Sequence, residues 1–187
     1  MSITTQRDLF LHELGDILFV ERTLEQEVLP KLINEVQDAE LRAGLKRHHT
    51  QTRKHVRNVE TAFKRMGKAP SAEKCLGFEG LKREHDELTS EATSTLTDAI
   101  DTGAAARTEH YEIAAYSGLI AMARGLGEKE IVPLLEENLA DEKQTLRELE
   151  KVSRRLAKGA STNGRSSRRR STTPTRRRTT TRPRSRS

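Results

Sequence analysis

Apolar residues recur at spacings of three, four and seven positions along most of the chain, which is the period of an amphipathic helix. This pattern predicts four long helices, over residues 5–36, 38–66, 97–126 and 130–158. Thr4 or Thr5 can cap the first helix. Pro30 lies inside that helix and removes one main-chain hydrogen bond, so we expect a kink there. Gly67 and Gly127 lie where the second and third helices are expected to end.

The links between these helices predict how they are arranged. The first and second helices, and the third and fourth, are joined by short links, which favour antiparallel hairpins. A longer link, Gly67 to Leu96, contains a shorter amphipathic segment, SAEKCLGFEGLKREHDEL. Two hairpins joined by one long crossover are typical of ferritin-like proteins. The sequence therefore predicts an all-α fold: a ferritin-like four-helix bundle of two antiparallel hairpins, with a long crossover that carries a shorter fifth helix.

Each of the four helices has an apolar seam that turns polar near mid-height. The polar residues at this level are Glu21, His48, Gln51, Thr52, His55, Glu109, Glu112 and Glu142. A carboxylate inside an apolar bundle is costly unless it is paired or bound to a cation. The spacing from Glu21 to Gln51 equals that from Glu112 to Glu142, which suggests a duplicated plan. Ferritin-like two-metal sites are duplicated in this way, with a Glu from each of two helices and Glu-x-x-His from the other two.

We therefore hypothesise a metal site. Carboxylates and imidazole suit iron, manganese or zinc, and we expect iron or manganese. The residues expected to bind the metal are Glu21, Glu109, Glu112, Glu142 and His55. Simpler interpretations stay open: a lone Glu on a seam can pair with an Arg or reach solvent, and the histidines of the second helix can be hydrogen-bonded or exposed. Tyr116, on the third seam, is interpreted as a core residue.

Composition narrows the class of protein. Aromatic residues make up only 3% of the chain and there is no Trp, which together with many Leu, Ala, Glu, Lys and Arg favours helices. The single Cys75 excludes an intramolecular disulfide and fits a reducing compartment. No apolar run approaches the ~20 residues of a membrane span, and the N-terminus lacks the pattern of a secretory signal. We expect a cytoplasmic bacterial protein.

The charge divides the chain into an acidic body and a basic tail. Of the 34 Lys and Arg, ten lie between Ser161 and Ser187, which leaves 24 against 28 Asp and Glu in the remainder. The ten are Arg165, Arg168, Arg169, Arg170, Arg176, Arg177, Arg178, Arg182, Arg184 and Arg186. We expect residues 1–159 to form the bundle and residues 160–187 to be disordered, because the tail has no large apolar residue to bury.

The arginines of the tail suit contacts with phosphate, because Arg keeps its charge and pairs bidentately. We expect non-specific binding to DNA through these ten residues, strongest at low salt, and association with the nucleoid. The tail has no aromatic residue for stacking on bases, which argues against single-strand specificity. A solubilising tail without a single partner stays open, and a membrane surface is a weaker option because no apolar anchor accompanies the charge.

Several stretches together resemble the YciE/YciF-type ferritin-like family: LFLHELGDILFVERTLEQEVLPKL, KCLGFEGLKRE, EHYEIAAYSGL and LLEENLADEK. The resemblance covers roughly residues 6 to 155. It implies a ferritin-like bundle, usually a homodimer, associated with bacterial stress responses and without a defined reaction. Glu109, Glu112 and Glu142 match the family. The family's second helix has a Glu-Glu-Thr run where this chain has the sequence TQT, residues 50–52.

This departure leaves Glu21 as the only carboxylate of the site on the first hairpin, with His55 or His48 as the candidates to assist it. We therefore expect a lopsided site that holds one metal better than two, and the missing Glu weakens the case for ferroxidase or oxidase activity. The predicted function is that of a ferritin-like stress-response protein with a transition metal in its core and a DNA-binding tail. The alternative is a metal-free structural or nucleoid-associated dimer with a degenerate site. The sequence identifies no small-molecule substrate.

Overall fold

The computed structural model describes residues 3–169, and these residues form helices joined by short links, with no strand among them. The helices are α1 (Gln6–Thr23), α2 (Leu29–Glu35), α3 (Ala39–Arg65), α4 (Leu76–Glu91), α5 (Thr97–Gly125) and α6 (Val132–Arg169). A π-helical turn, η1 (Leu24–Val28), joins α1 to α2, and a 3-10 turn, η2 (Ser94–Leu96), precedes α5. None of the described helices is long and apolar enough to cross a membrane.

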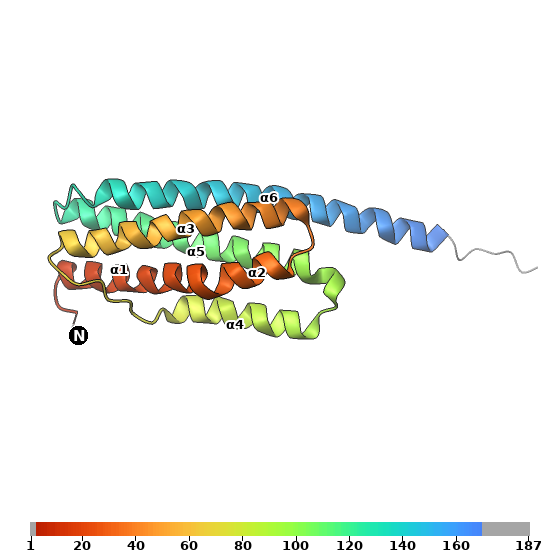
Figure 1. The fold of residues 1–187 in the computed structure, drawn as a ribbon, viewed down its shortest axis with the longest axis horizontal. Helices are drawn as coiled ribbons and strands as arrows, with labels where there is room; N and C mark the ends of the chain where they lie inside the picture. The colour runs from red at the N-terminus through yellow and green to blue at the C-terminus, as the bar shows by residue number, and fades with distance from the viewer. Residues whose placement is uncertain (1–2, 170–187) are drawn as a thin grey trace, which may run out of the picture.

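The helices form two antiparallel hairpins that pack side by side (Figure 1). One hairpin consists of α1, η1 and α2 against α3, and the other of α5 against α6. The hairpins contact each other through α3 with α6 and α1 with α5, while α4 lies on the outside against α5. This arrangement confirms the predicted ferritin-like bundle with a fifth helix in its crossover.

The helix ends follow from local sequence signals. Thr5 accepts a hydrogen bond from the Asp8 N–H, and the Asp8 carboxylate accepts one from the Thr5 N–H, which forms a capping box at the start of α1. The helices α3 and α5 end alike, at Gly67 (φ +69°) and Gly127 (φ +76°). A positive φ is cheap only for glycine. The start of the crossover after α3 and the turn of the α5–α6 hairpin therefore both depend on the glycines that predicted these helix ends.

Pro30 interrupts the first helix more than the kink expected from the sequence. The expected helix over 5–36 is interrupted, because Pro30 has no N–H for the helix ladder and its ring crowds the preceding turn. The chain widens just before it: the Leu29 N–H donates to the Leu24 carbonyl, five residues back. The expected kink is therefore the π-helical turn η1, and such turns are frequent at functional sites.

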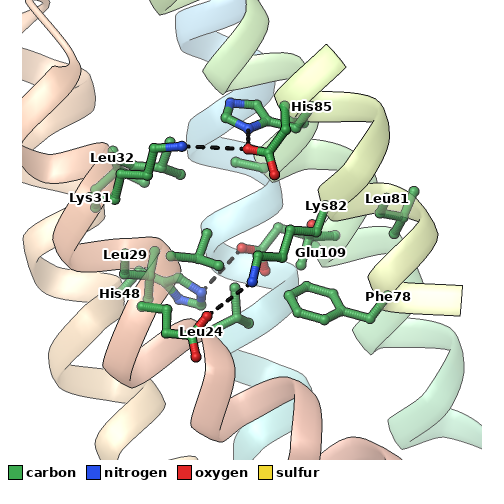
Figure 2. Close-up of a pocket in the computed structure, with 17 residues that line it drawn as sticks. Leu24, Leu29, Lys31, Leu32, His48, Phe78, Leu81, Lys82, His85 and Glu109 are labelled. Carbon is green, nitrogen blue, oxygen red and sulfur yellow. Dashed lines mark hydrogen bonds and ion pairs between the residues drawn. The ribbon is translucent and has the colours of Figure 1, made fainter. Parts of the chain in front are cut away.

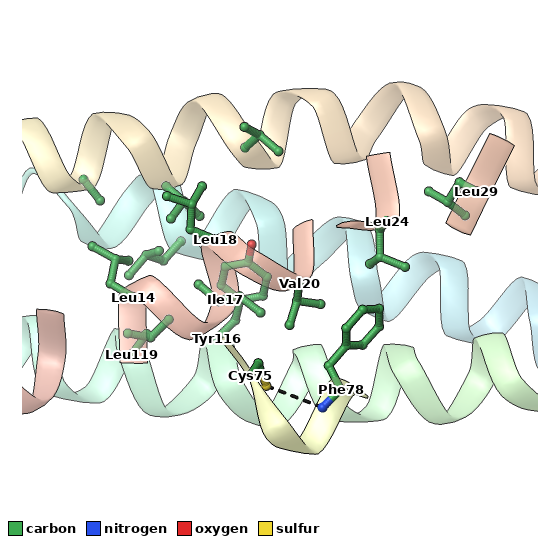
Figure 3. Packing of buried hydrophobic residues seen from close by; sticks show 14 of the residues in the cluster. Leu14, Ile17, Leu18, Val20, Leu24, Leu29, Cys75, Phe78, Tyr116 and Leu119 are labelled. Carbon is green, nitrogen blue, oxygen red and sulfur yellow. Dashed lines mark hydrogen bonds between the residues drawn. The ribbon is translucent and has the colours of Figure 1, made fainter. Parts of the chain in front are cut away.

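The apolar core fills the space between the hairpins on both sides of mid-height (Figure 3). Leu14, Ile17 and Leu18 of α1 are buried with Leu119 of α5. Full burial of one such side chain stabilises the fold by roughly 1.5–3 kcal/mol. Cys75 is also buried and caps α4, where its Sγ accepts a hydrogen bond from the Phe78 N–H at 3.5 Å.

The helix α6 is longer than its sequence pattern predicts. The expected end was Lys158, whereas the described helix continues to Arg169, past the end of the bundle (Figure 1). Residues 170–187, with seven of the ten tail arginines, lie outside the described residues. The division into a bundle of residues 1–159 and a tail of residues 160–187 stays a prediction.

Candidate metal centre

Six ionisable side chains meet inside the bundle at mid-height, contributed by four helices. They are Glu21 from α1, His48 and His55 from α3, Glu109 and Glu112 from α5, and Glu142 from α6. Each is at most 3% exposed. Residues three or seven apart on a helix share a face, which is why α3 and α5 can each send two side chains inward. All five residues predicted to bind a metal are among the six.

The first group of donors is formed mainly by the second hairpin. His48 Nε2 lies 3.2 Å from Glu109 Oε1 and 3.9 Å from Glu142 Oε2. Glu112 completes the group, and one donor atom from each of the four residues lies within 4.8 Å of the others. Donors on opposite sides of an ion that each bind it at about 2.1 Å are about 4.2 Å apart, so this spread is close to that of a coordination shell.

The second group joins the two hairpins through His55. Its Nδ1 lies 2.8 Å from Glu142 Oε1 and 3.2 Å from Glu21 Oε1. Glu142 belongs to both groups, one oxygen facing each histidine. A carboxylate placed in this way can bridge two ions.

The donor atoms converge without satisfying one another. Both oxygens of Glu112 and of Glu142, one oxygen each of Glu21 and Glu109, and the His55 Nδ1 are buried without a protein partner in hydrogen-bond geometry. His55 Nδ1 and Glu142 Oε1 are only 2.8 Å apart and form an ion pair, but their geometry is not that of a hydrogen bond. Each buried polar atom left unpaired costs about 1–3 kcal/mol. Lone pairs that face a common point suit a cation, so the residues present fit a metal ion.

Both imidazole rings are held from behind. The Nε2 of His55 lies 3.3 Å from Asp141 Oδ2, so its Nδ1 faces the centre. His48 has the opposite arrangement: its Nδ1 is hydrogen-bonded to Thr145 Oγ1 at 3.2 Å and its Nε2 faces the centre. Histidines that bind metals are usually fixed by an outer partner on the second ring nitrogen. The two rings therefore have the support that ligands need.

Tyr116 orients the one carboxylate from α1. Its hydroxyl donates a hydrogen bond to Glu21 Oε1 and accepts one from Asn138 Nδ2, which is 2.9 Å away. Asn58 Nδ2 in turn donates to Asn138 Oδ1 at 2.8 Å. Tyr116 is buried, as its interpretation as a core residue required. Sequence reasoning missed its polar role and that of Asn138, although Asn138 lies one helical turn before Glu142.

The electrostatics divide the carboxyl groups into two kinds. Burial raises the pKa of Glu109 and of Glu112 well above the usual carboxyl range, and the charge of Glu142 raises both further. Burial also raises the pKa of Glu21, against the opposing effect of His55. Burial opposes ionisation of Glu142 too, but the ion pair with positively charged His55 outweighs it and lowers the pKa of Glu142. Burial therefore favours the protonated form of Glu109 and Glu112, whereas the surroundings of Glu142 favour its ionised form.

The two histidines also differ. Burial lowers the pKa of His48, which favours its neutral form. Burial disfavours the charge on His55 as well, but the adjacent carboxylates Glu21 and Glu142 raise its pKa to about 11. Without a bound ion, the centre therefore holds one buried imidazolium beside Glu142.

The structure corrects two details of the predicted plan. The expected counterpart of Glu142 was Gln51, but Gln51 is only half-buried, and Thr52 is the residue of α3 that faces the centre with no exposed surface. The two hairpins thus carry Thr52-x-x-His55 and Glu142-x-x-Thr145. His48 lies within the centre although the predicted ligand set left it out. Its place on the apolar seam of α3 was the available signal.

Comparisons with known proteins agree with this fold. A family model described as a domain of unknown function, DUF892, matches residues 5–161. Protein YciF of Escherichia coli strain K12 is 31% identical over 154 residues, which cover 78% of this chain and 88% of YciF. Among solved structures, YcfI of Rhodopseudomonas palustris, a candidate structural protein, is 39% identical with a TM-score of 0.77 and covers 80% of this chain and 95% of its own.

The crystal structure of the E. coli stress protein YciF is 28% identical, also with a TM-score of 0.77. It covers 83% of this chain and 99% of its own. The family model and the identity to YciF confirm the resemblance inferred from the sequence motifs. The chain therefore belongs to the DUF892 family of YciF-type proteins.

Proposed function

We propose that this protein binds a transition metal, iron or manganese, at the buried centre and acts in bacterial stress protection. The observation that carries the proposal is the convergence of six buried donor residues, five of which have polar atoms without a protein partner in hydrogen-bond geometry. The names of its relatives support the stress role, since E. coli YciF is described as a stress protein.

The donor inventory supports the metal more strongly than the sequence did. A ferritin-like two-metal site uses four Glu and two His in total, and the buried centre of this chain contains the same set. Glu109 on α5 takes the place of the carboxylate that α3 lacks. The second histidine of the set is His48 on α3, whereas the ferritin-like pattern would place it on α6. Because Glu142 belongs to both groups, we propose room for two ions.

The chain's own residues prepare the centre for a cation. A bound iron or manganese ion supplies Lewis acidity and one-electron redox chemistry. Asp141 and Thr145 hold the imidazoles, and Tyr116 holds Glu21. Ligands must lose their protons to bind a metal, so we expect binding to release protons from Glu109, Glu112 and His55.

Metal content measures this directly. The full-length protein is loaded with Fe(II) or Mn(II), passed through a desalting column and analysed by mass spectrometry for metal per chain. We expect about one ion or more per chain, and less than about a tenth in Glu142→Gln, because that residue belongs to both groups. Glu150→Gln, at an exposed position of the same helix, is the matched control and should keep the wild-type content. A wild-type content below a tenth would remove the proposal.

A metal-free structural role is the alternative, and one observation favours it. His55, with its pKa raised to about 11, balances Glu142 without any ion, and the raised pKa of Glu109 and Glu112 favours their neutral forms. The centre can therefore exist without a metal at the cost of several unpaired polar atoms. The metal analysis separates the two functions.

We propose a second activity for the tail, non-specific DNA binding, which rests on ten arginines and no acidic residue in 161–187. Gel shifts at low salt should be lost when residues 161–187 are deleted. They should also be lost when the ten arginines are replaced by Gln, which keeps the length of the chain. The logarithm of affinity should fall with that of salt by about 0.9 per phosphate contact. Unchanged shifts in both variants would exclude the tail as the DNA contact.

We also propose that the protein is a homodimer, because a dimer carries two tails and would bind DNA with higher avidity than one chain. Light scattering of the full-length protein measures the mass in solution. A mass near that of one chain, 21.1 kDa, would exclude the dimer.

A further inference from the structure

A pocket leads from the surface of the bundle to the buried centre. It lies between η1 and α2 on one side and α4 and α5 on the other, and its volume is about 170 Å³. Its floor includes His48 and Glu109, two residues of the first donor group. Figure 2 shows this pair between the wall of Leu24 and Leu29 and the wall of Phe78 and Lys82. Within the described residues, this pocket therefore gives an apolar route from the surface to the centre. Its wall residues are not among the proposed metal ligands.

The walls of this pocket are apolar. Buried side chains from η1, α2, α3 and α4 line it: Leu24, Leu29, Leu32, Leu45 and Phe78. Ala105 of α5, which has a small side chain, leaves the space open on the remaining side. The π-helical turn contributes here, because Leu24, Glu27 and Val28 of η1 all line the pocket. The helix defect caused by Pro30 thus lies at the entrance to the site.

The rim is charged but balanced. Lys82 Nζ lies 2.9 Å from Glu27 Oε2, and Lys31 Nζ lies 3.4 Å from Asp86 Oδ1. Both pairs cross from α4 to η1 or α2, as Figure 2 shows for the two lysines. All four side chains are at least 34% exposed, and ion pairs of this kind are weak. They can open without much cost, and their charges cancel. His85, which also lines the pocket, is paired with Asp101 at 2.8 Å. The rim therefore does not select an anion or a cation.

The walls and the rim together decide what the pocket suits. A hydrated cation would lose water in an apolar passage without gaining polar partners, so the pocket is a poor route for the metal itself. An apolar cavity of about 150 Å³ in another protein stays dry and binds benzene or xenon. A small uncharged molecule with a hydrocarbon body would be favoured here in the same way.

We propose that this pocket binds a small, uncharged apolar organic molecule and holds it against His48 and Glu109. The role of that molecule as a substrate rests on the proposed metal function, because the metal would supply the reactive centre. The binding of that molecule to the pocket does not rest on the metal function, since η1 and helices α2 to α5 alone form the walls. The pocket thus indicates a substrate class for the site that the sequence did not identify.

Benzene is the probe for the pocket. It is titrated into metal-free full-length protein while leucine methyl groups are followed by NMR. We expect saturable shifts at Leu24, Leu29 and Leu45, and none at Leu14 and Leu119 elsewhere in the core. No saturable shift up to the solubility of benzene, or equal shifts throughout the core, would overturn the proposal.

Matched variants test the location. Ala105→Phe fills the pocket from α5 and should weaken benzene binding about tenfold or more. Ala105→Leu is a milder filling variant, used if the Phe variant does not fold. Ala114→Phe makes the same change at an exposed position of α5 and should bind benzene like the wild type. Unaltered binding in a folded Ala105 variant would contradict the assignment.

A second readout tests the contact with the centre. Mn(II) is paramagnetic, so benzene held against His48 and Glu109 should relax faster in Mn(II)-loaded protein than in metal-free protein. Faster relaxation supports both proposals. Mn(II) bound in the expected amount without benzene binding would overturn the pocket and leave the metal. Benzene bound in protein that takes up no metal would overturn the metal and leave the pocket.

Discussion

The two hairpins contribute unequally to the buried centre. The hairpin of α5 and α6 supplies three carboxylates, whereas that of α1 and α3 supplies one carboxylate and two imidazoles. Their electrostatics differ accordingly: burial raises the pKa of Glu109 and Glu112 and favours their neutral forms, while adjacent carboxylates raise the pKa of His55 and favour its positive charge. Neither half is balanced alone, because His55 of one hairpin stabilises ionised Glu142 of the other. The site is therefore a property of the interface between the hairpins.

The same comparison explains the departures from the pattern of ferritin-like two-metal sites. Thr52 and Thr145 occupy the places where a Glu-x-x-His motif would put Glu on α3 and His on α6. Each hydroxyl donates to a carbonyl of its own helix, Thr52 to His48 and Thr145 to Asp141, at 2.9 and 3.1 Å. A threonine satisfied in this way can be buried without a ligand role. Glu109 and His48 supply the lost groups from other positions at the same level.

The largest expected effect comes from breaking the charge balance between the hairpins. His55→Leu leaves Glu21 and Glu142 buried without their cation, and removal of one partner of a buried pair costs roughly 3–5 kcal/mol. His48→Leu removes a neutral ring and should cost less, about 1–3 kcal/mol. Urea denaturation of metal-free protein measures both. Equal losses in the two variants would contradict the asymmetry.

Metal binding should stabilise the fold, because the ion would join ligands from both hairpins. At a free Mn(II) concentration of about 100 times the dissociation constant, the free energy of unfolding should rise by about 2.7 kcal/mol. EDTA should reverse the gain, and Glu142→Gln should abolish it. Thermal unfolding with and without metal measures the difference. An equal gain in that variant would place the ion elsewhere.

The stability of the metal-free protein should fall as pH rises from about 5 to about 8. Burial raises the pKa of Glu109 and Glu112, so the folded state keeps protons that the unfolded state loses above its ordinary pKa. The raised pKa of His55 acts with the same sign between 6.5 and about 11. Each such group contributes at most about 1.4 kcal/mol per pH unit.

The control for this pH dependence is Glu112→Gln, which removes one titrating group and should flatten the slope of unfolding free energy against pH. His48 acts with the opposite sign below its ordinary pKa of 6.5, because burial favours its neutral form. Stability that rises steadily from about pH 5 to 8 would show that the carboxyl groups of α5 are ionised in the folded protein.

The smallest effect is expected when one carboxylate is moved between the hairpins. The double variant Thr52→Glu with Glu109→Gln places a Glu on α3 and removes one from α5, so the number of donors is unchanged. We expect wild-type metal content and a change in stability within about 1 kcal/mol, since the two changes compensate. Thr52→Gln with Glu109→Gln is the matched control and should bind less metal. Loss of metal from the first variant as well would show that position matters more than the number of carboxylates.

The sequence predicted the fold because its signals are local. Periodic apolar residues defined the helices, and Gly67 and Gly127 marked two ends that require positive φ. The π-helical turn could not be predicted, since Pro30 implies only that the ladder breaks and several local geometries can absorb it. The length of α6 was also missed, because nothing beyond Lys158 is periodic.

The candidate site was predictable in composition but not in detail. The polar level on four seams contained all six donors, and the predicted ligand set named five of them. His48 was ambiguous because a seam position alone does not show which ring nitrogen faces the centre. The hydrogen bond between Tyr116 and Glu21 joins residues 95 positions apart. The apolar pocket depends on where α4 lies against the bundle, and no periodicity within one helix encodes that placement.

The most direct test is anomalous X-ray scattering from crystals of the full-length protein loaded with Mn(II). The account predicts an anomalous peak inside the bundle, bounded by His48, Glu109, Glu112 and Glu142, with a second position beside Glu21 and His55 at full loading. Peaks confined to the surface, or none in crystals grown from protein with bound manganese, would contradict the claim that these six side chains form a metal centre.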